Sequence, residues 1–451
     1  MNATVSLTQG PPGTGKTTTA AAGACARISA RRSVGDIVLV AAQTHRAANE
    51  LLQDLAAAVE SAQAQALPLP PIHIAKALKG QPSSGDPRLP KGNIPLINPA
   101  APVRDVQAHR NGGVLVIGGT TSALLEMAGN LDKSARFGGV PSGFQVPLLL
   151  VDEASMMGFP HLLALLTLLR GDGEVQVSGD HRQLAQILAQ AWEREKRPPT
   201  VHYRPFLSAY DMIRAMAEKL PRAAVWLSAL NHTFRLPPGI RALIAPLYAG
   251  DGIALAGDAR DRQDPPTEPP AAGWEAIWGD PADVFLVVHS EAESVRSNPL
   301  EARVIEEILD AHPGAPSGSV AVVTPHCAQR SLLRRLLKGT GDARPAVDVI
   351  DTADSLQGGQ RDTVIVSGTT SDPAALVTGA EFRLNPNRWN VAFTCAQSRL
   401  VVVCSESWLC HIPPEAEQYE GLALWKALPC QCARLIANQV VDGHTVRVFA
   451  G

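Results

Sequence analysis

The sequence has no apolar run long enough to cross a membrane, and the few residues ahead of its first strand-like stretch leave no room for a signal peptide. It also lacks an excess of positive charge, because 40 Lys and Arg side chains oppose 43 Asp and Glu, for a net charge of −3. This balance argues against a strongly basic protein that coats nucleic acid, while a local basic groove stays compatible with it. We therefore expect a cytoplasmic protein.

Cysteine is sparse, and its seven residues are odd in number and far apart, which indicates reduced thiols and not a disulfide framework. Cys410, His411, Cys430, Cys432 and His444 could form a zinc site, but their spacing matches no standard ligand pattern well. We favour buried or incidental thiols and keep zinc as the alternative. With 451 residues, 45% hydrophobic and 18% charged, the composition is typical of a globular protein of two or three domains.

A phosphate-binding loop is the most informative feature that the sequence does contain. The stretch from Gly10 to Thr17 reads GPPGTGKT and fits the pattern G-x-x-x-x-G-K-[ST]. Glycines at this spacing let backbone N–H groups converge on an anion, while Lys16 supplies a cation for the β- and γ-phosphates and Thr17 a hydroxyl for Mg²⁺. A short strand at 5–7 precedes the loop and an Ala-rich helix follows it, so the helix N-terminus should face the phosphates.

Two further strand ends carry polar groups suited to nucleotide chemistry. The run LLLVDEAS places Asp152 and Glu153 after an apolar strand, where P-loop enzymes hold an acid on Mg²⁺ and a second acid that can polarise the attacking water. Two adjacent carboxylates there are costly unless a cation is present, although a solvated strand end is the alternative. In SGDHRQL, the Gln183 amide could sense the γ-phosphate, and a turn with a helix cap is the simpler reading.

Apolar runs alternate with helical stretches in two series, which favours an α/β fold with parallel sheets covered on both faces. We predict a first domain over 1–225, with a Pro- and Gly-rich loop insertion at about 66–113. A second α/β domain should span 226–409, followed by a C-terminal tail over 410–451.

Nine motifs follow one another between residues 9 and 400: QGPPGTGKT, LVAAQTHRAANELL, VIGGTTSALL, VDEAS, SGDHRQL, LNHTFRLPPGI, VVTPHCAQR, DTADSLQGGQRDTVIVS and NRWNVAFTCAQSRL. In these motifs and their order the chain resembles superfamily 1 helicases of the 5′-to-3′ branch, and within it the group of RNA-decay, DNA-replication and nidovirus helicases. The resemblance implies two tandem RecA-like P-loop domains, ATP in the cleft between them, and single-stranded nucleic acid across their tops.

The resemblance also implies roles for individual residues. Those that bind ATP would be Gly10, Gly13, Thr14, Gly15, Lys16, Thr17, Thr18 and Gln360, with Thr17 and Asp152 holding Mg²⁺. The catalytic residues would be Lys16, Asp152, Glu153, Gln183, which couples the γ-phosphate to domain closure, and Arg235, which reaches it from the second domain. The nucleic-acid groove would be lined by Gln43, Thr44, Thr120, Thr121, Thr324, Pro325, His326, Thr352 and Gln357. For each threonine, ordinary capping at a strand end is the alternative.

Three departures from the family's pattern bear on activity. Cys395 stands where the last motif, N-x-A-x-T-R-A, has an arginine finger, and such arginines are worth about 10³–10⁵ in rate. Arg399 could compensate, but we favour a structural role for it. Gln360 replaces an acid expected in Q-G-x-E. Only eight residues precede Gln9, so the adenine motif and accessory β-domain expected there are missing, which fits a fragment, a piece of a split gene or a degenerate paralogue.

The resemblance therefore implies an ATP-dependent helicase or translocase acting on single-stranded DNA or RNA, with a separate N-terminal or partner subunit as a further expected partner. The alternative is a slow or inactive nucleotide-binding switch or scaffold without unwinding activity, which Cys395 and Gln360 favour. Turnover stimulated by nucleic acid would separate the two readings. A P-loop kinase fails because it leaves the second α/β series unexplained.

Overall fold

The chain divides into two compact units, which are described separately. Unit 1 comprises Met1–His181 and Ala185–Leu230, and unit 2 comprises Arg182–Leu184 and Asn231–Gly451. No helix in the described part of the chain is long and apolar enough to span a membrane. The computed structural model describes residues 4–31, 34–80, 82–83, 85–110, 112–133, 144–186, 206–217, 219, 225–258, 273–312, 319–337, 347–356, 359–413 and 418–451.

Unit 1 contains a sheet of eight strands in the order β4-β3-β5-β2-β6-β7-β1-β8, and all of its strand pairs are parallel. Its strands are β1 (Thr4–Gln9), β2 (Ile37–Ala42), β3 (Ile72–Ala77), β4 (Leu96–Ile97), β5 (Val114–Thr120), β6 (Val146–Asp152), β7 (Leu169–Gly179) and β8 (Val225–Ala229). Its helices are α1 (Lys16–Arg31), α2 (His45–Ala64), α3 (Val103–Arg110), α4 (Thr121–Asp132), α5 (Phe159–Leu166) and α6 (Ala209–Ala217).

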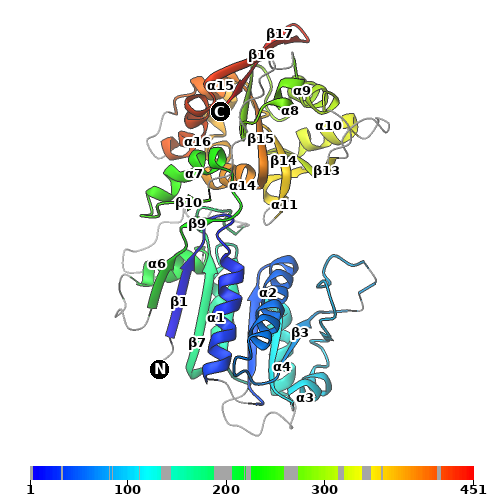
Figure 1. Ribbon diagram of the computed structural model, residues 1–451, viewed down its shortest axis with the longest axis vertical. Coiled ribbons are helices and arrows are strands. Elements are labelled where there is room, and N and C mark those ends of the chain that lie inside the picture. The colour runs from blue at the N-terminus through cyan, green and yellow to red at the C-terminus, as the bar shows by residue number, and fades with distance from the viewer. Residues whose placement is uncertain are drawn as a thin grey trace. The chain divides into compact units, whose positions relative to one another are not determined.

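Helices cover both faces of this sheet (Figure 1), which explains the continuous apolar runs of its central strands. Along β2, Val38 and Val40 pack in a cluster with residues of α1 and α2, whereas Leu39 and Ala41 pack in a second cluster with residues of α4 and α5. Every residue of β2 is buried. The predicted parallel α/β layer is therefore confirmed for unit 1.

The stretch 66–113, expected to be a loop insertion, is not a loop throughout, and that expectation is corrected here. It contributes the strands β3 and β4 to the sheet and the helix α3. Its prolines lie outside β3. Pro71 directly precedes that strand, and its carbonyl accepts from the Val114 N–H at 2.8 Å. A Cβ on Gly113 would lie 2.1 Å from that same oxygen, so glycine is required for the close approach.

Unit 2 contains a second sheet, of seven strands in the order β13-β12-β14-β15-β11-β17-β16, parallel except for the pairs that involve β17. The strands are β11 (Val284–His289), β12 (Val320–Thr324), β13 (Val347–Thr352), β14 (Arg361–Ser367), β15 (Ala396–Ser405), β16 (Arg434–Val441) and β17 (His444–Ala450), and β9 (His232–Thr233) pairs separately with β10 (Ala256–Gly257). The helices are α7 (Pro238–Ala249), α8 (Glu275–Gly279), α9 (Pro299–Asp310), α10 (Cys327–Leu337), α11 (Ala353–Leu356), α12 (Pro373–Thr378), α13 (Ala380–Arg383), α14 (Pro386–Thr394), α15 (Glu406–Cys410) and α16 (Tyr419–Gln431).

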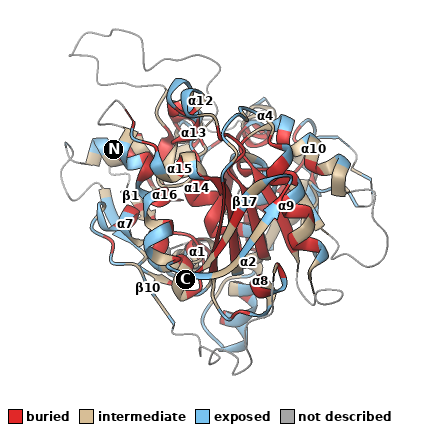
Figure 2. Ribbon diagram, turned by 90° about the horizontal axis from the view of Figure 1, so that it is seen from above, coloured by how far each residue is buried: buried red, intermediate tan, exposed pale blue. Residues whose placement is uncertain are grey.

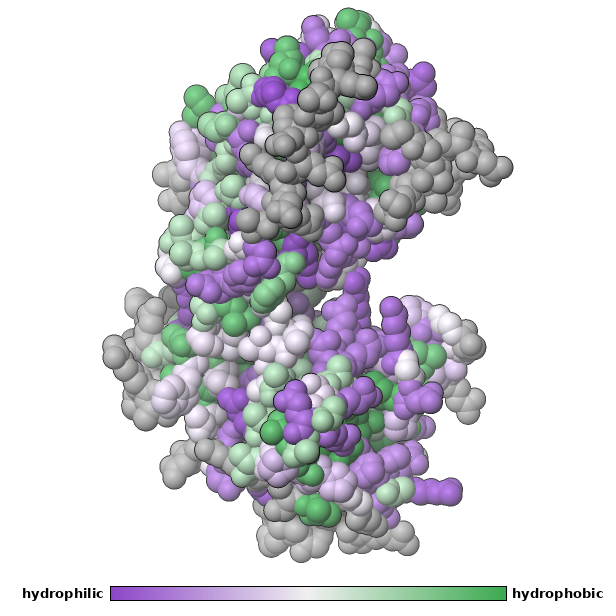
Figure 3. Space-filling model, in the orientation of Figure 1, coloured by the Kyte–Doolittle hydropathy of each residue, from purple (hydrophilic) through white to green (hydrophobic). Residues whose placement is uncertain are grey.

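The second sheet is also covered on both faces. Phe285 and Val287 of β11 pack in a cluster with residues of α9, while Leu286 and Val288 pack in a cluster with residues of α7, α14 and α16. The strands are largely coloured as buried in Figure 2, and the visible surface of each unit mixes hydrophilic and hydrophobic side chains (Figure 3). Two α/β units with largely parallel sheets agree with the expected tandem RecA-like domains.

The chain beyond residue 410, expected to be a tail, is built into unit 2. The hairpin of β16 and β17 turns at Asp442 and Gly443, both at positive φ (49° and 82°), and β17 pairs antiparallel with β11. Trp425 of α16 is fully buried and packs edge-on against Trp389, with ring centroids 4.7 Å apart. The Asp-Gly pair between alternating apolar residues was the signal that could have predicted this hairpin.

The expected domain boundary after 225 also falls too early. Strand β8 begins at Val225 and pairs in parallel with β1, so it belongs to the sheet of unit 1. The unit changes between Leu230 and Asn231.

Candidate functional site

The loop between β1 and α1 adopts the backbone conformation that its glycines permit. Gly13 and Gly15 lie at φ 75° and 72°, in the left-handed region that favours glycine. A Cβ on Gly10 would lie 2.7 Å from the Cβ of Lys16, so a larger residue would displace the lysine stem. The Thr14 hydroxyl donates to the Pro11 carbonyl at 2.8 Å and closes the loop. The expected anion-binding loop therefore forms ahead of the N-terminus of a 16-residue helix.

The acidic pair at the end of β6 lies against this loop. Lys16 Nζ is 3.0 Å from Glu153 Oε1, and the Thr17 hydroxyl donates to Asp152 Oδ2 at 2.9 Å. The other oxygen of Asp152 accepts from the Ser178 hydroxyl at 2.6 Å and from the Glu153 N–H at 2.9 Å. Four residues that the sequence singled out separately thus form one cluster.

The cluster is buried and carries an excess of negative charge. Burial by itself would lower the pKa of Lys16, but the carboxylates of Glu153, Asp152 and Asp180 together hold it above its ordinary value. Lys16 is thus a fixed cation at the base of the loop, and bound phosphates would meet a charged ammonium.

Glu153 is the strained member of the cluster. It has φ 51°, a conformation that non-glycine residues rarely adopt, and its Oε2 is buried without a hydrogen-bond partner among the described residues. Strain of this kind concentrates at functional sites. A buried carboxylate oxygen with unused hydrogen-bonding capacity is what a base that accepts a proton from water requires.

Asp152 and Thr17 provide oxygen donors of the type that Mg²⁺ prefers. Mg²⁺ in nucleotide sites takes one or two protein ligands and fills its remaining positions with water and phosphate oxygens. The two side chains are already adjacent at 2.9 Å, so they fit such an ion. No group of three or more His, Cys, Asp or Glu that could hold a metal occurs within the described ranges, and the thiols of Cys430 and Cys432 approach the backbone carbonyls of Lys426 and Val284 instead.

A network that the sequence did not predict joins Gln9, just before the loop, to the segment after β7. Gln9 Nε2 lies 3.2 Å from His181 Nδ1, and the Tyr210 hydroxyl donates to Gln9 Oε1 at 3.3 Å. The His181 ring stacks on Tyr210, and its Nε2 is 2.9 Å from Arg214 Nη1. Tyr210 and Arg214 lie on α6, some 200 residues from the loop, and belong to no motif that could have indicated them.

The three residues Arg182–Leu184 pack within unit 2, although the chain on either side of them belongs to unit 1. Arg182 forms two hydrogen bonds with the carboxylate of Asp251, at 2.8 and 2.9 Å, and a further ion pair with Glu420. These bonds raise the pKa of Arg182 above its ordinary value. Asn390 Nδ2 donates to the Arg182 carbonyl at 2.7 Å, so Gln183 lies in a segment that unit 2 holds firmly.

The other residues expected near the nucleotide belong to unit 2. The backbone N–H of Arg235 donates to the hydroxyl of Thr233 at 3.4 Å, and Gln360 Oε1 accepts from Gln397 Nε2 at 2.8 Å. These positions follow β9 and precede β14, respectively. Their roles towards a nucleotide stay predictions.

Cys395 and Arg399 differ in their surroundings. Cys395 is the C-cap of α14, is only 4% exposed, and directs its sulfur towards the Leu356 carbonyl at 3.9 Å. Arg399 Nη2 donates to the carbonyls of Trp278 and Asp280 at 3.4 and 3.1 Å. Since the guanidinium of Arg399 is held by backbone acceptors inside unit 2, a structural role is the reading that its contacts favour.

In unit 1, the expected nucleic-acid residues stand at the carboxyl ends of β2 and β5, which are neighbours in the sheet. Gln43 and Thr44 are exposed, and the Thr44 hydroxyl caps α2 by accepting from the Ala47 N–H at 3.2 Å. Thr120 is half-buried, and Thr121 is buried with a hydroxyl that has no hydrogen-bond partner among the described residues. Gln43, Thr44 and Thr120 are therefore the accessible members.

In unit 2, the corresponding residues stand at the ends of β12 and β13, where Thr324 and Thr352 are register partners. Both threonines and Pro325 are buried, and the Thr324 hydroxyl lies 2.9 Å from that of Thr369. Thr324 therefore fits the structural alternative better than direct contact with a strand. His326 is half-exposed, and Gln357 lies outside the described residues.

Comparison with known proteins matches two AAA domain models to the chain, one over residues 1–189 and the other over 215–407. The DNA replication ATP-dependent helicase/nuclease JHS1 of Arabidopsis thaliana is 26% identical over 279 residues, which covers 58% of this chain and 19% of that protein. Regulator of nonsense transcripts 1 of Dictyostelium discoideum is 24% identical over 277 residues, with the same coverages. The chain spans about a fifth of the length of these curated relatives.

Among solved structures, the complex of an arterivirus helicase, nonstructural protein 10, with DNA matches 93% of this chain and 62% of that chain, with 16% identity and a TM-score of 0.40. The two AAA domain models together account for most of the chain, and the curated relatives include a helicase by name. The chain therefore contains two AAA domains of the superfamily 1 helicase type and is a distant relative of these proteins.

Proposed function

We propose that this protein is an ATP-dependent helicase or translocase that hydrolyses ATP at the P-loop of unit 1 and binds single-stranded DNA or RNA. The observation that carries the proposal is the cluster in which Lys16 contacts Glu153 and Thr17 contacts Asp152. The two helicase-type AAA domains and the distant relative that is named a helicase support the nucleic-acid half of the proposal.

The contacts of unit 1 suggest how these side chains divide the work. When phosphates enter the loop, Lys16 exchanges its ion pair with Glu153 for the β- and γ-phosphate oxygens. Glu153 is then free to accept a proton from the attacking water. Thr17 and Asp152 would hold Mg²⁺, which neutralises charge that develops on the phosphates. Arg235 is the cation that the family resemblance assigns to unit 2.

Binding of a single strand should weaken steeply as salt rises. Phosphate contacts dominate non-specific grooves, and each phosphate neutralised on a single strand contributes about −0.7 to the slope of log K against log salt. We expect a strong preference for single strands over blunt duplex, measured by fluorescence anisotropy titrations at several salt concentrations. Binding that is independent of salt, or that prefers blunt duplex, would contradict a helicase-type groove.

The second candidate function is a slow nucleotide-dependent switch, and Cys395 is the observation that favours it. An arginine finger stabilises charge on the γ-phosphate in the transition state, and Cys395 has no cation to offer. Nucleic-acid binding without strand-stimulated turnover would establish this reading over the first.

Substitution Cys395→Arg is expected to raise kcat for ATP by about 10-fold with little change in KM, below the 10³–10⁵ of a native finger. The gain is limited because Cys395 is buried and the new side chain must extend past Leu356 to leave the core. Steady-state kinetics with saturating single strand measures it, and Cys395→Met, which adds length without charge, is the matched control. An unchanged kcat in Cys395→Arg together with a lost kcat in a folded Arg399→Ala variant would identify Arg399 as the finger instead.

A further inference from the structure

Unit 2 presents a cluster of positive charge beside a partly exposed aromatic ring. The arginine cluster consists of Arg296, Arg383 and Arg388, and it adjoins His326 and Phe382. The Phe382 ring is 41% exposed, stacks against His326 with centroids 5.3 Å apart, and lies 4.0 Å from the Arg388 guanidinium carbon. Arg296, Phe382 and Arg383 belong to none of the motifs that the sequence offered for nucleic-acid contact.

The charge of this cluster is incompletely neutralised. Arg383 is only 7% exposed, and it donates to the Thr370 hydroxyl at 3.0 Å and to the Ala375 carbonyl at 2.5 Å, with no ion pair to a carboxylate among the described residues. Arg388 reaches Asp354 only at 3.5 Å. Burying a guanidinium without an anionic partner is costly, so the site is suited to receive an anion from outside.

The same charges act on His326. Burial, together with the charges of Arg383, Arg296 and Arg388, lowers the pKa of His326 to about 4. The imidazole is therefore neutral at physiological pH and can donate one ring N–H without adding to the repulsion. The pKa of Arg383 is lowered in turn by burial and by Arg296, although Asp372 opposes this.

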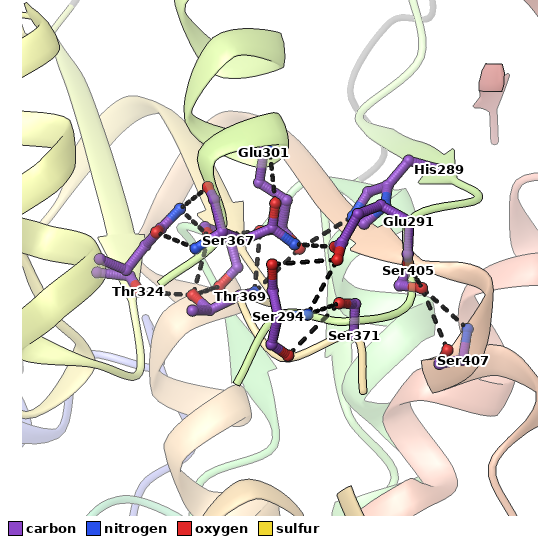
Figure 4. A network of polar contacts seen from close by, with 12 residues as sticks. His289, Glu291, Ser294, Glu301, Thr324, Ser367, Thr369, Ser371, Ser405 and Ser407 are labelled. Carbon is purple, nitrogen blue, oxygen red and sulfur yellow. Dashed lines mark hydrogen bonds and ion pairs between the residues drawn. The ribbon is translucent and has the colours of Figure 1, made fainter. Parts of the chain in front are cut away.

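A buried polar network that includes Glu301, Ser367 and Thr369 (Figure 4) holds the backbone next to Thr370, the residue that accepts a hydrogen bond from Arg383. Glu301 is fully buried and accepts from the Thr369 N–H at 2.9 and 3.0 Å and from the Ser367 hydroxyl at 2.5 Å, while His289 Nε2 lies 3.2 Å from it. These bonds fix Thr369 at φ 64°, which a threonine rarely adopts. The strained turn is thereby held against relaxation.

The same network ties the loop that carries Arg296 to the loop at 369–371, which contacts Arg383. The Ser294 N–H donates to the Ser371 hydroxyl at 2.8 Å, and the Thr370 hydroxyl donates to the Val295 carbonyl at 2.8 Å. Arg296 follows directly in the chain, and Thr370 in turn accepts from Arg383. The backbone that carries Arg296 and the side chain of Arg383 are therefore held before any ligand arrives, which reduces the cost of binding.

We propose that the arginine cluster is a phosphodiester-binding subsite for a single-stranded nucleic acid, in which Arg296 and Arg383 contact phosphate oxygens and the exposed part of Phe382 contacts the adjoining sugar or base. The inference rests on the proposed function and names residues for it. Arginine suits this task because its planar donors match phosphate oxygens in pairs. His326 directly follows Thr324 and Pro325 at the end of β12, so the subsite lies at the carboxyl edge of the sheet.

Substitution Arg296→Gln tests the subsite, because this exposed side chain can be changed without disturbing the core. A strand-binding titration over a range of salt should show a slope whose magnitude is smaller by about 0.7 than that of the wild type. If the two proteins bind equally at 1 M salt, the variant should then bind about fivefold more weakly than the wild type at 0.1 M. Arg303→Gln is the matched control, since Arg303 is exposed on α9 and paired with Glu306, and its slope should equal that of the wild type.

Two further variants separate charge from apolar contact. Arg383→Gln should lower the slope as Arg296→Gln does, provided that thermal unfolding shows it folded. Phe382→Ala should weaken binding about fivefold or more without changing the slope. A wild-type slope in Arg296→Gln, in a protein that does bind single strands, would overturn the subsite and leave the proposed function standing. A wild-type protein that binds no strand at any salt would overturn both.

Discussion

Replacing Glu153 by glutamine is expected to lower the ATP turnover rate by about 10²–10⁴ while ATP binding persists. Glutamine matches the shape of Glu153 but cannot accept a proton from water, and it removes the partner that Lys16 must leave when phosphates bind. Nucleotide binding should therefore be unchanged or tighter. A coupled ATPase assay together with titration of a fluorescent ATP analogue measures both quantities.

The matched control for this variant is Glu126→Gln, which removes a carboxylate on α4 that pairs with exposed Lys79. Its turnover should equal that of the wild type. Turnover like the wild type in Glu153→Gln would mean that Glu153 is not the base, and that its strained backbone has another cause.

Replacing Lys16 by alanine is expected to abolish measurable ATP hydrolysis, with a loss of at least about 10²–10³ in kcat and a clear weakening of ATP binding. The change removes the cation from the loop and leaves the carboxylates of Glu153, Asp152 and Asp180 without the Lys16 charge that they interact with. The anionic phosphates would then meet a buried, negatively charged site. The same two assays, run with and without Mg²⁺, test this expectation.

Lys79→Ala is the control for Lys16→Ala, because Lys79 is a solvent-exposed lysine of the same unit. Circular dichroism should show that both variants keep the helix content of the wild type. If Lys16→Ala binds and hydrolyses ATP normally, the loop at 10–17 is not the nucleotide site.

The candidate site in unit 1 was predictable because its parts are local or stand at strand ends. The phosphate-loop sequence has glycines at 13 and 15, which permit the positive φ that the loop adopts there. The apolar run that ends in Asp152 and Glu153 predicts that both acids lie at the carboxyl edge of a parallel sheet. Parallel strands bring those ends together whatever the loops between them do. That is why Thr17 and Asp152, far apart in the chain, were expected to meet.

Other features depend on contacts that no local pattern encodes. The Pro-rich sequence at 66–71 suggested a loop, yet these prolines lie just before β3. The strand itself was hard to recognise because it is only six residues long and mixes apolar with charged side chains. Tyr210 and Arg214 reach the loop region only through the packing of α6. The arginine cluster assembles residues from three separate segments of unit 2, so its charge becomes visible only once the sheet is formed.

The departures at Cys395 and Gln360 were visible in the sequence, and the structure adds their surroundings. The Cys395 side chain is buried in the core, and the Gln360 side chain accepts a hydrogen bond from Gln397. Both positions are thus accommodated within unit 2 without a charge. This is consistent with a slow enzyme as well as with a switch, and only turnover distinguishes them.

The most direct test of ATP hydrolysis coupled to nucleic acid is the steady-state ATPase rate of the wild-type protein with and without a saturating single-stranded oligonucleotide, with Glu153→Gln measured in parallel. We predict a rate that rises with the strand and disappears in Glu153→Gln under both conditions. A rate that the strand leaves unchanged, in a protein that binds both ATP and the strand, would contradict the helicase or translocase function and favour the nucleotide-dependent switch.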